Sequence, residues 1–190
     1  MFQLDTPRLI LRDFVADDWQ AMHLIFADDE TTRYIDWLKS ETEVDTQKRV
    51  NDIIYHNACK PRISYNLLIE RKTDQASIGW IGIGGATDQT LGDLDFGYAL
   101  GKAYWGQGFM TEALQHLLDF SFQTLHVKKI FGVCDIANVG SVRVMEKVGM
   151  TLEATLIKQN DTTGRIDESL RFAILYEDWL REREVGKHHA

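Results

Sequence analysis

The feature that most limits the folds open to this chain is a change of hydrophobic period at its centre. Between residues 63 and 100, three segments rich in apolar residues are separated by turn residues, which predicts an antiparallel meander of strands 63–70, 77–86 and 93–100. From Gly108 to Thr124, apolar side chains recur every three or four positions, which predicts an amphipathic helix facing a core. A meander that leads into a long helix indicates helices packed on a sheet.

The flanking segments extend this pattern. We expect further strands at 8–12, 129–135, 151–158 and 166–174, and further helices at 17–27, 41–58, 138–147 and 176–184. This order predicts a single α/β (α+β) domain with a mixed twisted sheet of about seven strands flanked by four or five helices. We expect the domain to span residues 1–184 and residues 185–190 to form a disordered tail.

Composition narrows the class of partner. The chain has 190 residues and a formal net charge of −8, so we expect neither nucleic acid nor a membrane surface as a partner, since both attract a basic field. Its two cysteines form no CxxC motif and its six histidines show no metal-ligand spacing, so we expect no metal. The first residues do not resemble a signal peptide and no apolar run approaches about 20 residues, so we expect a cytoplasmic protein.

Charge and glycine are unevenly distributed along the chain. Residues 1–60 hold 12 acids and 7 bases, a net charge of −5, whereas residues 101–150 hold 4 acids and 5 bases, a net charge of +1. Nine of the 14 glycines lie between Gly79 and Gly108. Such a glycine-dense centre indicates either tight hairpins or a backbone that closely approaches a ligand.

The run Tyr104–Ala113 places a short glycine loop between a strand and a helix. The first amides of a helix have no internal partner, and the helix dipole adds positive potential, so such a loop is suited to an anion. A tight turn without a ligand explains the same spacing. A Walker loop is absent, and Gly106-Gln107-Gly108 is followed by Thr111 where a dinucleotide fingerprint needs a third glycine.

Six segments in order carry a resemblance to a known family: Thr6–Arg12, Asp95–Leu100, Tyr104–Ala113, Asn138–Ser141, Met145–Met150 and Ala173–Trp179. On these the chain resembles the GNAT superfamily of acyl-CoA-dependent N-acetyltransferases, and looks closest to the branch of ribosomal-protein N-terminal (alanine and serine) acetyltransferases. Trp105 stands where the family signature usually has Gln or Arg, and a tryptophan at this position is usual in this branch. The resemblance implies acetyl-CoA as the co-substrate.

The resemblance also implies which residues bind the coenzyme. Main-chain amides of the loop would bind the pyrophosphate, and a splayed strand would bind the pantetheine arm and stabilise the oxyanion through an amide of Tyr98 or Ala99. Asn138 would contact the pantetheine or simply cap its helix, and Arg143 and Lys147 would meet the 3′-phosphate or remain solvated surface charges. The full set of expected coenzyme-binding residues is Tyr98, Ala99, Leu100, Gly106, Gln107, Gly108, Phe109, Met110, Thr111, Asn138 and Arg143.

Two catalytic residues follow from the resemblance. Asp95 stands where the family has an acidic residue before the strand glycine, and would act as general base, directly or through a water. Many members use a tyrosine as the acid, but Met145 occupies that position here, so the branch points to Ser141 as the proton donor to the thiolate. The alternatives are a surface carboxylate for Asp95 and a first-turn helix residue for Ser141.

The acceptor pocket is expected near Tyr34, Asp36, Trp37 and Trp80, because aromatic rings and a carboxylate suit a cationic amine. Ordinary packing is the alternative for these four. We therefore expect an acetyl-CoA-dependent N-acetyltransferase acting on a protein N-terminal α-amine or a small-molecule amine. A catalytically silent acyl-CoA-binding or regulatory module is the alternative, and the branch implies that the protein can form a homodimer.

Overall fold

The computed structural model describes residues 1–85, 93–159 and 166–187. Its strands form one sheet in the order β1-β2-β3-β4-β5-β6-β8-β7. Neighbouring strands are antiparallel except β5 and β6, which are parallel, so the sheet is mixed. The strands are β1 (Gln3–Asp5), β2 (Leu9–Asp13), β3 (Ser64–Arg71), β4 (Ala76–Gly85), β5 (Asp93–Leu100), β6 (Lys129–Asp135), β7 (Thr151–Gln159) and β8 (Ile166–Leu175).

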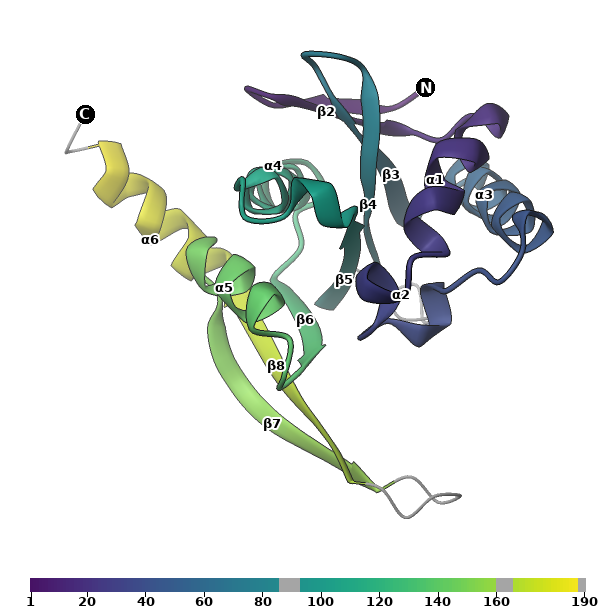
Figure 1. Cartoon of the computed structure of the whole chain (residues 1–190). Helices are drawn as coiled ribbons and strands as arrows, with labels where there is room; N and C mark the ends of the chain where they lie inside the picture. Colours follow the sequence, from purple (N-terminus) through teal and green to yellow (C-terminus); the bar gives the residue numbers. More distant parts are fainter. Residues whose placement is uncertain (86–92, 160–165, 188–190) are drawn as a thin grey trace.

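Helices cover both faces of the sheet (Figure 1). Helix α4 packs with the core that contains Leu114 and Leu117, whereas α1 and α3 lie over the second core, which contains Phe26 and Trp80. The α-helices are α1 (Trp19–Phe26), α2 (Asp29–Thr32), α3 (Glu43–Ala58), α4 (Phe109–Thr124), α5 (Val139–Lys147) and α6 (Tyr176–Lys187), and three short 3₁₀ turns are η1 (Ala16–Asp18), η2 (Asp36–Leu38) and η3 (Lys102–Tyr104).

The predicted fold class is confirmed, with small differences in the elements. Within the described residues the sheet has eight strands, not about seven, because β1 is a three-residue strand that only its pairing with β2 defines. The four-residue helix α2 adds a sixth helix in these residues to the four or five expected. Helix α6 continues to Lys187, past the expected start of the tail at residue 185, while residues 188–190 and residue 86 of the expected strand 77–86 lie outside the described residues.

The centre of the sheet is split between its two parallel strands. β5 and β6 pair only through Asp93–Asp95 and Lys129–Phe131. Beyond these residues β5 continues to pair with β4, and β6 with β8, so the facing edges of 96–100 and 132–135 are not joined to each other. The Phe96 ring lies at the divergence, with its Cζ 2.4 Å from where a Cβ on Gly132 would stand. The split leaves open strand edges in the middle of the protein.

Candidate active site

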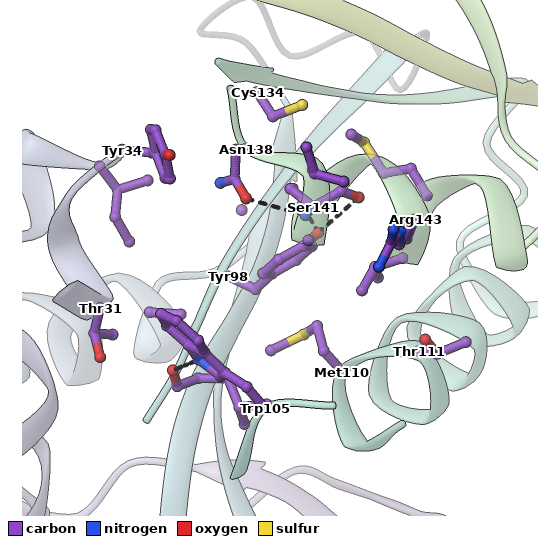
Figure 2. A pocket seen from close by; sticks show the side chains of 18 of the residues that line it. Thr31, Tyr34, Tyr98, Trp105, Met110, Thr111, Cys134, Asn138, Ser141 and Arg143 are labelled. Carbon is purple, nitrogen blue, oxygen red and sulfur yellow. Dashed lines mark hydrogen bonds between the residues drawn. The ribbon is translucent and has the colours of Figure 1, made fainter. Parts of the chain in front are cut away.

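A cavity of about 930 Å³ occupies the split (Figure 2). Its walls are the open edges of β5 and β6, the loop that begins α4, the first turn of α5 and residues from the segment 30–37. Most residues expected to bind coenzyme, acceptor or the reacting atoms line it; these are Tyr34, Trp37, Asp95, Tyr98, Ala99, Leu100, Gly106, Gly108, Phe109, Met110, Thr111, Asn138, Ser141 and Arg143.

The loop before α4 presents an array of backbone amides. Gly106 and Gly108 have φ of 72° and 78°, a left-handed conformation that glycine adopts without a Cβ penalty. Gly108 is the N-cap of α4. Within the described residues, no protein acceptor meets the amide N–H groups of residues 106–111. Open amides at a helix N-terminus make this loop suited to an anionic group, since the helix dipole also favours negative charge there.

A clamp that the sequence analysis missed holds this loop against the start of the chain. The Glu112 carboxylate accepts bonds from the Thr6 hydroxyl at 2.6 Å, the Arg8 amide at 2.8 Å and Arg8 Nε at 2.6 Å. Arg8 Nη1 donates to the Gln107 carbonyl at 3.0 Å, and its guanidinium lies 4.5 Å from the centre of the Phe109 ring. No local signal reveals the clamp, because about a hundred residues separate its two sides.

The open edge of β5 presents the main chain of Tyr98. The Gly101 amide donates to Ile78 in β4, and the Ala99 carbonyl lies 2.4 Å from where a Cβ on Gly79 would stand. Along an antiparallel pair, the backbone N–H and C=O groups of successive residues point alternately toward and away from the partner strand. The N–H and C=O of Ala99 therefore point toward β4, whereas those of Tyr98 point toward the cavity. Of the two amides considered for the oxyanion, Tyr98 is therefore the available one.

The two faces of β5 lead to different parts of the site. Asp95 and Ala99 share the face of Gly97, where an added Cβ would meet Trp80 at 3.2 Å and Trp37 at 3.9 Å. Tyr98 lies on the other face, with the core under α4. Asp95 is exposed, but the protein around it raises the pKa of its carboxyl by desolvation. A raised pKa suits a carboxylate that accepts a proton near neutral pH.

Ser141 lies at the start of α5, where several groups converge (Figure 2). Its amide donates to Asn138 Oδ1 at 3.1 Å, which caps the helix. Its hydroxyl oxygen lies 2.7 Å from the Tyr98 hydroxyl. Cys134 lines the same cavity, and burial raises the pKa of its thiol to about 11. Met145 is buried in the core and also lines the cavity, and its thioether has no proton to donate.

The expected acceptor residues do not all reach the cavity. The Tyr34 hydroxyl donates to the Ala137 carbonyl at 3.3 Å, and Trp37, with 62% of its surface exposed, packs edge-on against Trp80. Trp80 is buried and donates its Nε1–H to Asn66 at 3.2 Å, so it supports Trp37 from below and does not line the cavity. Asp36 lies in η2, exposed and outside the lining.

Three other features bear on the expected site. The Gln107 side chain donates to the Ala103 carbonyl at 3.0 Å, and Gln107 does not line the cavity, unlike the other residues expected to bind the coenzyme. Arg143 is exposed and lines the cavity together with Lys147. Among residues 1–85, 93–159 and 166–187, no cluster of three or more metal-ligating side chains occurs, and none of their helices could span a membrane.

Comparison with known proteins agrees with this geometry. Residues 8–151 match the family described as "Acetyltransferase (GNAT) domain". The uncharacterised N-acetyltransferase p20 of Bacillus licheniformis is 27% identical over 94% of this chain and 99% of its own. A crystal structure of a GNAT-family acetyltransferase from Bacillus anthracis has a TM-score of 0.81 and 26% identity over 93% of this chain and 99% of that one. RimL, a ribosomal L7/L12 α-N-protein acetyltransferase solved with coenzyme A, has a TM-score of 0.78 and 19% identity over 92% and 98% of the two chains.

Proposed function

Because the chain belongs to the GNAT acetyltransferase family, we propose that it transfers the acetyl group of acetyl-CoA to a primary amine by direct attack in a ternary complex. One observation carries the proposal. The open edge of β5 at residues 96–100 lines the same cavity as Gly106 and residues 108–111, whose amides have no protein acceptor within the described residues. Together they offer an extended hydrogen-bonding edge that leads to an anion site, which matches a pantetheine arm that ends in a pyrophosphate.

The cavity also fits the coenzyme in size and charge. A cavity of about 930 Å³ lies near the upper end of the range for small-molecule and cofactor sites. Arg143 and Lys147 line it and provide positive charge for the 3′-phosphate, while the amides of the loop serve the pyrophosphate. This arrangement explains how a chain of net charge −8 accommodates a polyanionic coenzyme without a broad basic surface.

The residues divide the chemistry between the two faces of β5. Asp95, on the side of Trp37, takes the proton of the attacking amine directly or through a water. The amine nitrogen bonds to the thioester carbon, and the Tyr98 amide stabilises the oxyanion. The carbon–sulfur bond then breaks with its electron pair on sulfur, and Ser141 gives that sulfur a proton. The products are the acetamide and free coenzyme A.

The acceptor is a protein N-terminal α-amine or a small-molecule amine. RimL, which acts on an α-N-protein amine, shares the fold and supports the first class. Tyr34 and Trp37 line the cavity and suit a cationic group of either class. We also propose that the catalytic domain spans residues 1–184 and that the protein assembles as a homodimer, as the branch suggests.

The proposal is tested by mixing the protein with acetyl-CoA and a panel of peptides, polyamines and amino acids, and measuring free thiol. We expect at least one amine to release thiol at a saturable rate. Ser141→Ala should lower kcat by between roughly tenfold and a hundredfold, because proton transfer contributes in that range, while coenzyme affinity changes little. Coenzyme binding without turnover on any amine would favour the silent module, and absence of binding by calorimetry would exclude both functions.

A further inference from the structure

We propose that Tyr98 is a positioning residue for acetyl transfer, whose phenol donates a hydrogen bond to Ser141 Oγ and so directs the Ser141 proton toward the departing thiolate. The inference rests on the proposed function, because it assigns a role within that reaction. This role is separate from the main-chain role of Tyr98. The amide lies at the open edge of β5, whereas the ring lies on the face that packs with the core under α4.

The distances identify Ser141 Oγ as the partner of the phenol. Tyr98 Oη lies 2.7 Å from Ser141 Oγ and 3.4 Å from the Ser141 carbonyl oxygen. The phenol has a single proton, and 2.7 Å is the usual separation for an O–H···O bond whereas 3.4 Å is long. When the phenol donates, as we propose, its acceptor is therefore Ser141 Oγ and not the carbonyl oxygen. Figure 2 shows the ring reaching across from β5 to the start of α5.

Tyr98 remains protonated, so it acts as a fixed donor. Burial raises the pKa of the Tyr98 hydroxyl above its ordinary value, and the bond to Ser141 only partly offsets this. The single proton of this hydroxyl is held in the bond to Ser141 Oγ, so Tyr98 acts on the reaction through Ser141. The neighbouring Cys134 thiol also stays neutral, since burial raises its pKa to about 11.

The Ser141 proton is then the one available for the reaction. With its oxygen accepting from Tyr98 and its backbone fixed by Asn138, the Ser141 hydroxyl has its own proton free to point away from Tyr98. When the carbon–sulfur bond breaks, the electron pair goes to sulfur and this proton follows. Ser141 regains a proton from solvent, while the proton lost by the amine passes to solvent through Asp95. Tyr98 keeps its proton throughout. A tyrosine at the position of Met145 is not needed as the proton donor.

The test is Tyr98→Phe, measured as the single-turnover rate of acetyl transfer from acetyl-CoA to an amine that the wild-type protein accepts. We expect the rate to fall about tenfold, the fold-change that corresponds to one lost hydrogen bond in the transition state. The Kd for coenzyme A, measured by calorimetry, should stay within about twofold and verifies that the variant is folded. Tyr65→Phe is the matched control, because that ring packs against Phe2 in the distant part of the sheet.

The double variant Tyr98→Phe with Ser141→Ala shows whether Tyr98 acts through Ser141. We expect it to be no slower than Ser141→Ala alone. An unchanged rate in Tyr98→Phe would overturn the inference. A Kd for coenzyme A that weakens in parallel with the rate would also overturn it, because a purely structural bridge between β5 and α5 gives that result. A wild-type protein that turns over no amine would instead refute the proposed function, so the two failures are distinguishable.

Discussion

At the scale of single residues, Gly108 is the position where backbone conformation and ligand binding depend most directly on each other. Gly108 is the N-cap of α4 with a φ of 78°, and it lines the cavity. An added Cβ would find its nearest neighbour, Arg8 Nη2, at 3.5 Å, so there is room for a methyl group. The cost of a substitution therefore comes from the left-handed conformation and not from a clash.

We expect Gly108→Ala to lower the free energy of unfolding by about 1–2 kcal/mol, the cost of a left-handed non-glycine residue. Relaxation of the loop should also weaken coenzyme A binding severalfold. Urea denaturation and calorimetry measure the two effects. The control for the stability measurement is Gly140→Ala in α5, where an added Cβ meets only Asn138 Oδ1, at 3.7 Å, and helix propensity favours alanine. Because Gly140 also lines the cavity, this variant is not used as a control for affinity. Equal stability and affinity in wild type and Gly108→Ala would contradict this account of the loop.

At the scale of elements, the clamp around Glu112 joins the segment before β2 to the first turn of α4. Burial raises the pKa of Glu112, but hydrogen bonds from Thr6 and Arg8 lower it by more, so the net shift is downward. A carboxyl whose pKa is lower in the folded state stabilises the fold above its unfolded pKa of about 4.5. That stabilisation is lost as the pH falls through the lower, folded-state pKa.

We therefore expect Glu112→Gln to be less stable than wild type by about 1–2 kcal/mol at pH 7, because a hydrogen-bonded and partly buried charge is lost. The difference should shrink as the pH is lowered from 7 to below about 4.5, because wild-type Glu112 becomes protonated as the pH falls through its lowered folded-state pKa. Urea denaturation across this pH range measures it. The exposed Glu146→Gln is the control and should not lose stability at pH 7. A Glu112→Gln deficit that stays constant down to pH 3 would refute a role for the charge.

At the scale of the whole molecule, the sequence was informative where a pattern is local and long. The 16 residues of α4 and the glycine loop before it could be predicted because their periodicity and turn residues lie together. The three-residue β1 could not, because pairing alone defines it. Neither could the Arg8–Glu112 clamp or the Tyr98–Ser141 bond, since each depends on how distant elements are placed in the fold. Trp80 appeared as a pocket residue because sequence does not show which aromatic ring lies beneath another.

A ligand bound in the split of the sheet would join the two halves of the protein. The β5 and β6 halves are joined by three residue pairs and by side-chain bonds that include Tyr98–Ser141 and Tyr34–Ala137. A ligand that bonds to the open edge of β5 acts as an additional strand between them. Coenzyme A should therefore stabilise both halves together and protect the edge amides from exchange.

We expect coenzyme A at about a hundredfold its Kd to stabilise the fold by about 2.7 kcal/mol, which corresponds to a rise in Tm of roughly 5–10 °C for a chain of this size. Amide hydrogen exchange should slow at residues 96–100 and 106–111 and remain unchanged in β7. ATP is the matched ligand, because it carries phosphates without a pantetheine arm, and it should leave exchange at 96–100 unaffected. Protection confined to the loop would show that the edge of β5 does not bind the coenzyme, since the pantetheine arm is the part of coenzyme A that would bond to this edge.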